Sequence, residues 1–182
     1  MKFSAKTPLL LVIILACVII ASAQMPPPPP GPKTKVIGKA KIYEFKTKTK
    51  AESVFLNRND KQRIHATFEV PAEQAGAKPK GVLFFYRSFS DNGFKHKEDD
   101  KFAIFLNDKS ATQSEAELVM AICNSKKETE CQEILKSPLL SFTDFEAMLK
   151  AENVKIQFGE TVFELTREEK DGLRDLQRAL DK

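Results

Sequence analysis

Apolar and polar residues alternate along much of the chain between residues 39 and 123, a pattern typical of half-buried β-strands. The turn residues Asn59-Asp60-Lys61 separate two such runs and predict a hairpin. Residues 81–89 begin apolar on both faces, which favours a central strand. The expected strands of this part are residues 39–46, 53–58, 62–70, 81–89, 101–106 and 115–123.

The last third of the chain contains two helix-start signals. Thr143 with Glu146, and Thr166 with Glu169, have the spacing of capping boxes. The first helix is expected to run through Lys150. The second carries an apolar stripe that is expected to pack in the core, formed by Leu173, Leu176 and Leu180.

Between these helices, residues 154–158 and 161–165 are expected to form two strands around a turn at Gly159. No βαβ alternation occurs between residues 39 and 123. The sequence therefore predicts a single α+β domain over residues 35–182. Its about seven to eight strands would be mostly antiparallel and sandwich-like, with two short helices in the C-terminal region.

Residues 1–23 are organised like a secretory signal peptide. Lys2 and Lys6 precede the apolar run 9–20, and Ala21-Ser22-Ala23 supplies the small residues that precede cleavage. The apolar run is shorter than the roughly 20 residues of a membrane-spanning helix, so no permanent membrane span is expected. We expect export to the periplasm or the cell exterior, with cleavage after Ala23. A lipoprotein cleaved before Cys17 is the alternative.

Residues 24–34 form a Pro-rich linker. Five consecutive prolines favour a solvated polyproline II rod, because proline fixes φ and lacks an amide donor. A semi-rigid spacer is the expected role, and a ligand for an aromatic groove is the alternative.

Charge is distributed unevenly along the chain. Residues 24–50 hold seven lysines against one acidic residue, although the formal net charge of the whole chain is only +4. This near-neutral total gives no support for a nucleic-acid partner. Lysines that alternate along an edge strand discourage aggregation, which is the favoured interpretation; attraction to anionic lipids, cell-wall polymers or acidic glycans is the alternative. The residues concerned are Lys39, Lys41, Lys46, Lys48 and Lys50.

The remaining chemistry is sparse. Cys123 and Cys131 are expected to form a disulfide in an exported protein. The two histidines, His65 and His96, fit no common zinc spacing, so no metal and no cofactor are expected. His65 is expected at a solvent-facing or rim position, and His96 in a solvated loop of mixed charge. No catalytic residue is assigned.

The turn after residue 90 is the candidate contact region. Phe89, Phe94 and Lys95 flank Asn92-Gly93. Aromatic rings at such a tip either fold back onto the sheet, which is the favoured interpretation, or serve as contacts.

The C-terminal 45 or so residues resemble those of uncharacterised secreted bacterial proteins. The shared elements are Phe142-Thr143-x-Phe145, Val154-x-Ile156-x-Phe158-Gly159, Phe163-x-Leu165-Thr166 and a closing Leu-bearing helix. The resemblance implies a bacterial source and supports the fold class, and it implies no activity.

We therefore expect an exported, non-enzymatic binding or structural module whose ligand is unknown. An envelope protein or an anionic polymer is the kind of partner that the lysines would suit. The alternative is an exported hydrolase that acts through paired carboxylates, because such a pair needs no local motif.

The site of signal cleavage can be checked directly. We expect the exported protein to begin at Gln24 and to carry no lipid, because Ala21-Ser22-Ala23 fits cleavage better than the segment before Cys17 fits lipidation. Intact mass spectrometry of the mature protein measures this. A diacylated species that begins at Cys17 would contradict the prediction.

Overall fold

The computed structural model describes residues 33–38, 40–44, 48–53, 57–59, 61–71, 79–124 and 126–181. Contacts within the chain divide it into Met1–Gly31 and Pro32–Lys182, and all described residues belong to the second unit. The expected signal peptide, Cys17 and most of the Pro-rich linker lie outside the described residues. Within the described part, no helix is both long and apolar enough to cross a membrane.

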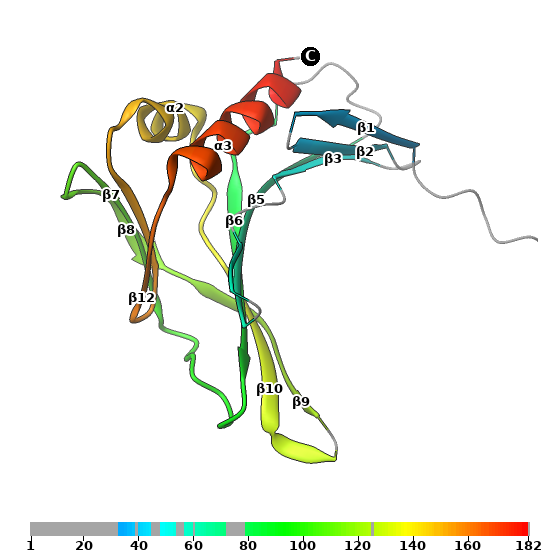
Figure 1. Ribbon diagram of the computed structural model, residues 1–182, viewed down its shortest axis with the longest axis vertical. Helices are drawn as coiled ribbons and strands as arrows, with labels where there is room; N and C mark the ends of the chain where they lie inside the picture. The colour runs from blue at the N-terminus through cyan, green and yellow to red at the C-terminus, as the bar shows by residue number, and fades with distance from the viewer. Residues whose placement is uncertain are drawn as a thin grey trace, which may run out of the picture. The chain divides into compact units, whose positions relative to one another are not determined.

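Two antiparallel sheets form the framework of the second unit (Figure 1). The larger sheet has the order β1-β2-β3-β5-β6-β10-β9, with β4 paired to β5. Its strands are β1 Lys33–Ile37, β2 Ala40–Glu44, β3 Lys48–Ser53, β4 Asn57–Asn59, β5 Gln62–Pro71, β6 Leu83–Ser90, β9 Glu117–Asn124 and β10 Lys127–Lys136.

The smaller sheet has the order β12-β11-β7-β8. Its strands are β7 Lys101–Leu106, β8 Lys109–Glu115, β11 Val154–Phe158 and β12 Thr161–Glu164. The chain passes from the larger to the smaller sheet after β6 and returns at Ala116, which alone separates β8 from β9. The two sheets are therefore joined by three connections, at residues 91–100, at residue 116 and at residues 137–153.

The core lies between the sheets because alternate residues of both point inward. Strand β6 alternates between half-buried and buried positions, and β11 does the same. Tyr86 of β6 meets Phe158 of β11 with ring centroids 5.5 Å apart, and Phe158 meets Phe102 of β7 at 5.0 Å. These contacts link the two inner faces, as in a sandwich.

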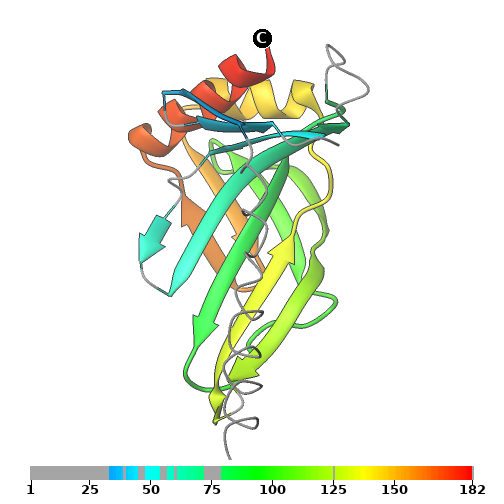
Figure 2. The same ribbon diagram turned by 90° about the vertical axis from the view of Figure 1, so that its right-hand side faces the viewer.

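Two helices complete the core beside the first strands of the larger sheet (Figures 1 and 2). Helix α2 is Phe142–Lys150 and helix α3 is Arg167–Leu180. Helix α3 packs against β1, β2 and β3, and its Leu173 and Leu176 are fully buried. The predicted capping box is present: Thr166 Oγ1 accepts a hydrogen bond from Glu169 N at 3.2 Å, and Glu169 accepts one from Thr166 N at 2.7 Å.

The predicted α+β fold, mostly antiparallel and sandwich-like with two helices in the C-terminal region, is confirmed. Strand β8 was not expected, because its polar sequence KSATQSE is exposed on nearly every residue and shows no apolar alternation. Residues 131–136, which are absent from the expected strands, belong to β10, which pairs with β6 on one side and β9 on the other.

The predicted hairpin before residue 70 differs in its first strand. Strand β5 pairs with β3, which ends at Ser53, and with the short strand β4, Asn57–Asn59; residues 54–56 of the expected strand 53–58 lie outside the described residues. Both segments therefore use the same partner, one after the other.

The lysine-rich segment occupies three strands of the larger sheet. Lys41 lies on β2, whereas Lys48 and Lys50 lie on β3. Edge protection is the wrong interpretation for these three lysines, because β2 and β3 are paired on both sides; of the three strands that the segment occupies, only β1 lies at an edge of the sheet. Lys39 and Lys46 lie outside the described residues.

Helix α2 begins two residues earlier than its predicted capping box. Ser141 is the N-cap, and its Oγ accepts a hydrogen bond from Asp144 N at 3.2 Å. Thr143 lies inside the helix with an exposed side chain, so the predicted capping role of Thr143 is wrong. A nearby serine with the correct backbone conformation takes the position instead.

This cap gives a paired test. We expect Ser141→Ala to lower the free energy of unfolding by about 1 kcal/mol, because the Asp144 amide loses its acceptor. Thr143→Ala is the matched control and should change it by less than about 0.5 kcal/mol. Urea denaturation of both variants measures the difference, and a larger loss for Thr143→Ala would contradict this cap.

Candidate functional site

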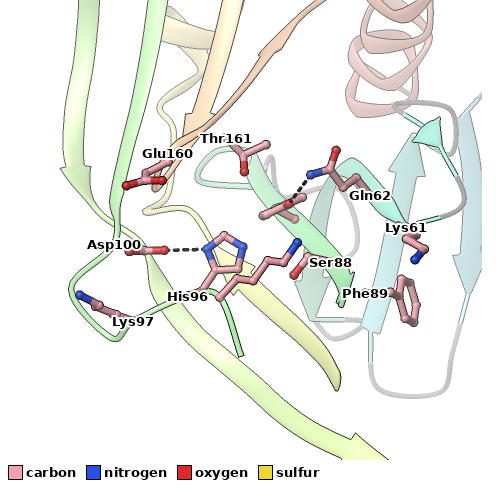
Figure 3. Close-up of a pocket in the computed structure, with 11 residues that line it drawn as sticks. Lys61, Gln62, Ser88, Phe89, His96, Lys97, Asp100, Glu160 and Thr161 are labelled. Carbon is pink, nitrogen blue, oxygen red and sulfur yellow. Dashed lines mark hydrogen bonds and ion pairs between the residues drawn. The ribbon is translucent and has the colours of Figure 1, made fainter. Parts of the chain in front are cut away.

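A pocket of about 520 Å³ lies where the connection between β6 and β7 passes from one sheet to the other (Figure 3). The described residues that line it come from three parts of the fold. The larger sheet and its β5 turn contribute Lys61, Gln62, Tyr86, Ser88 and Phe89; the connection contributes Lys95, His96, Lys97 and Asp100; the β11–β12 turn contributes Glu160 and Thr161.

A buried carboxylate holds the connection in place. Glu133 of β10 is fully buried, and it faces Ser88 across the β6–β10 pair. Its oxygens accept hydrogen bonds from the backbone N–H of Lys95 at 3.0 and 3.2 Å and from that of His96 at 2.9 Å. Ser88 Oγ donates a longer one at 3.5 Å. A buried charge is tolerated when it is hydrogen-bonded in this way, so Glu133 fixes residues 95 and 96 over the larger sheet.

His96 is directed inward by this anchor. Its Nδ1 lies 2.6 Å from Asp100 Oδ2, and the two side chains are only 6% and 18% exposed. The His96 ring also meets the Tyr86 ring edge-on, with centroids 5.3 Å apart. The prediction of a solvated His96 is therefore wrong, because backbone hydrogen bonds to Glu133 draw the charged run onto the sheet.

The Asp100 carboxylate sets the donor pattern of the imidazole. A carboxylate only accepts hydrogen bonds, so Nδ1 of His96 carries the proton that Asp100 accepts. Figure 3 shows the other ring nitrogen, Nε2, facing away from Asp100 toward the side of the pocket formed by Gln62 and Ser88. None of the described residues hydrogen-bonds this second nitrogen.

The smaller sheet and the return connection fix Asp100. Its carbonyl oxygen accepts a hydrogen bond from Ala116 N at 2.7 Å, at the point where the chain returns to the larger sheet. Gly159 packs against its carboxylate: a Cβ on this residue would lie 2.6 Å from Asp100 Oδ2, and the φ of Gly159 is +56°. Glycine therefore meets both the space and the backbone requirement at this turn.

Tyr86 forms the floor of the pocket. Burial raises the pKa of its phenol, and the negative charge of Glu133 raises it further, whereas hydrogen bonds with Thr161, Gln62 and Ser88 act in the opposite direction. Gln62 Nε2 donates one of these hydrogen bonds to the phenol oxygen at 3.2 Å. Tyr86 is consequently a neutral hydrogen-bonding group near pH 7.

Charged groups of both signs surround the opening. Lys61 forms an ion pair with Asp91, and Asp100 is engaged by His96. The ammonium groups of Lys95 and Lys97 have no ion-pair partner among the described residues, and the same holds for the carboxylate of Glu160. Counted over the described lining, the pocket therefore presents two cations and one carboxylate that have no ion-pair partner there.

The structure brings together only part of the predicted contact region. Phe89 and Lys95 line the pocket, but Phe94 does not. Phe94 is 54% exposed, so the interpretation that its ring folds back onto the sheet is wrong. From the lysine-rich segment, Lys41 and Lys50 do not line the pocket.

Several residues of the site were missed by sequence reasoning. Glu133 lies in a polar stretch that gives no sign of its burial. His96 and Asp100 are four residues apart in a charged run, a spacing that carries meaning on a helix but little in a loop. His65, expected at a solvent-facing or rim position, is half-buried, and its ring stacks on Phe85 of β6 at 5.3 Å.

The predicted disulfide is present beside the site. Cys123 of β9 and Cys131 of β10 are directly paired, with Cα atoms 4.0 Å apart. Cys131 precedes Glu133 by two residues on β10, so both side chains lie on the same face of the sheet. The bond closes a short loop, which corresponds to about 2–3 kcal/mol in the chain-entropy account. No cluster of potential metal ligands occurs in the part of the chain that the structure describes.

Comparison of the chain with protein-family models, with curated proteins and with solved structures gives no match. The resemblance to secreted bacterial proteins therefore stays a prediction, and the function has to be argued from the site itself.

The raised pKa of Tyr86 predicts loss of stability in alkali. The group binds its proton more tightly in the folded than in the unfolded protein, where its pKa is about 10. Its contribution is therefore fully present below that value and is lost as the pH rises through the folded-state pKa.

The Tyr43→Phe variant isolates this group, because the chain has two tyrosines. Its ultraviolet absorbance should show the remaining phenol ionising at higher pH in the folded protein than in urea. Ionisation at the same or a lower pH would contradict the buried Tyr86.

Proposed function

We propose that the chain is an exported binding module that holds a small polar anion, or the anionic end of a larger envelope component, in this pocket. The observation that carries the proposal is that the ammonium groups of Lys95 and Lys97, which line a polar cavity, have no ion-pair partner among the described residues. Two cations that lie two residues apart on a fixed connection attract an anion and raise its rate of association with the site.

The neutral groups of the pocket would orient the ligand. Gln62, Tyr86 and Thr161 provide amide and hydroxyl groups on one side, as small-molecule sites commonly do. Glu160 would accept a hydrogen bond from a hydroxyl or amino group of the ligand. The volume of about 520 Å³ is within the usual range for such sites. A hydroxylated acid, such as an acidic sugar unit, satisfies all of these groups together.

Binding accounts for the arrangement better than carboxylate-based hydrolysis does. The pocket holds two acidic residues, Asp100 and Glu160, but the Asp100 carboxylate already accepts a hydrogen bond from His96 at 2.6 Å. A pair acting as acid and base, or as acid and nucleophile, needs both carboxyl groups directed at the substrate. The only serine in the described lining, Ser88, donates its hydroxyl to Glu133.

Isothermal titration calorimetry of the mature protein tests the proposal. The probes are sulfate, acetate and glucuronate at low ionic strength, and at least one is expected to bind. The double variant Lys95→Gln/Lys97→Gln should bind at least about tenfold more weakly, because it loses hydrogen bonds to charged donors.

Lys150→Gln is the matched control for this experiment. Its side chain is 80% exposed on helix α2 and is absent from the pocket lining, so the affinity should stay at the wild-type value. Absence of binding for every probe, or equal losses in the double variant and the control, would contradict an anion site at this pocket.

A further inference from the structure

The two nitrogens of His96 have different surroundings. Nδ1 donates its proton to Asp100 at 2.6 Å, whereas Nε2 faces the pocket and has no hydrogen-bond partner among the described residues. In the neutral ring, only one nitrogen carries a proton. Because Asp100 places that proton on Nδ1, the neutral ring presents a lone pair to the pocket at Nε2.

A bound anion meets this lone pair unfavourably. An oxygen of the anion can only accept hydrogen bonds, so neutral Nε2 gives it no donor and repels it. A protonated ring donates from both nitrogens, to Asp100 through Nδ1 and to the anion through Nε2. The geometry therefore favours the charged ring when an anion is present.

We propose that the pocket takes up its anion together with a proton on His96, so that the affinity for the anion rises as the pH falls. This inference rests on the proposed anion-binding function and adds its regulation. Linkage requires the converse as well: the bound anion shifts the titration of His96 to higher pH.

Other charged groups face the same ring. The negative groups are Asp100 at Nδ1, Glu160 on the same side of the pocket as Asp100, and buried Glu133 at the His96 backbone N–H. The positive groups are Lys95 and Lys97, which flank His96 on the connection, and Lys61, which is paired with Asp91. Tyr86 contributes a neutral ring. The bound anion adds a negative charge on the Nε2 side of the imidazole.

The chain supplies an internal reference for the experiment, because His65 is its only other histidine. His65 lies on β5 beside Phe85 and does not line the pocket. Nuclear magnetic resonance of the two imidazole C–H groups follows both titrations in one sample of the mature protein. The probe is sulfate, whose charge is constant between about pH 5 and pH 8, the range in which histidine titrates. Sodium chloride at matched ionic strength is the reference condition.

We expect sulfate to shift the titration of His96 to higher pH and to leave that of His65 unchanged. Sulfate should bind about tenfold more tightly at the acidic end of this range than at the alkaline end, the worth of one hydrogen bond to a charged group. His96→Gln keeps an N–H donor that does not titrate, so this variant should bind sulfate with nearly the same affinity at both ends. His65→Gln should keep the wild-type pH dependence.

Each failure has a distinct meaning. Sulfate that binds equally at both ends of the range, with an unmoved His96 titration, would overturn proton uptake and leave the anion site standing. Equal shifts of both histidines would also overturn it, since they indicate a general salt effect. If sulfate binds at neither end and the other probes do not bind, the anion site itself is wrong, and proton uptake with it.

Discussion

A single buried carboxylate, that of Glu133, holds in place the connection that forms one side of this pocket. Glu133 has no access to solvent, and its hydrogen bonds go to backbone amides of a segment almost 40 residues earlier in the chain. Burying a charge costs free energy unless its lone pairs are satisfied, and here the connection between the sheets satisfies them. These hydrogen bonds fix the backbone of the connection, so His96 has a defined position although the segment has no regular secondary structure.

The connection that carries His96 is held by contacts with both sheets. Glu133 holds residues 95 and 96 to the larger sheet, while Asp100 is tied to the return connection through Ala116 and packs against the turn of the smaller sheet. His96 lies between these two anchors, and the hydrogen bond to Asp100 fixes the position of its imidazole. Pocket geometry therefore depends on the packing between the sheets, and the aromatic contact of Tyr86 with Phe158 contributes to that packing.

The sequence allowed the fold class, the disulfide and helix α3 to be predicted, because each has a local signal: apolar alternation, two cysteines in an exported chain, and the capping box at Thr166. Strand β8 has no such signal, because its extended conformation is stabilised by backbone pairing with β7 and not by burial of apolar side chains. The site was largely hidden for the same reason. Glu133 acquires its role only when β10 is placed beside β6, which is a property of the topology.

The geometry of the pocket also depends on Gly159, although this residue is not among those that line the cavity. This residue packs behind the Asp100 carboxylate, and any side chain there would push that carboxylate away from the imidazole. The cavity would keep all of its groups, yet His96 would lose the partner that decides which of its nitrogens carries the proton. The position of the proton on His96 therefore depends on the absence of a side chain at Gly159, a turn residue of the smaller sheet that contacts Asp100 and does not touch the ligand side of the pocket.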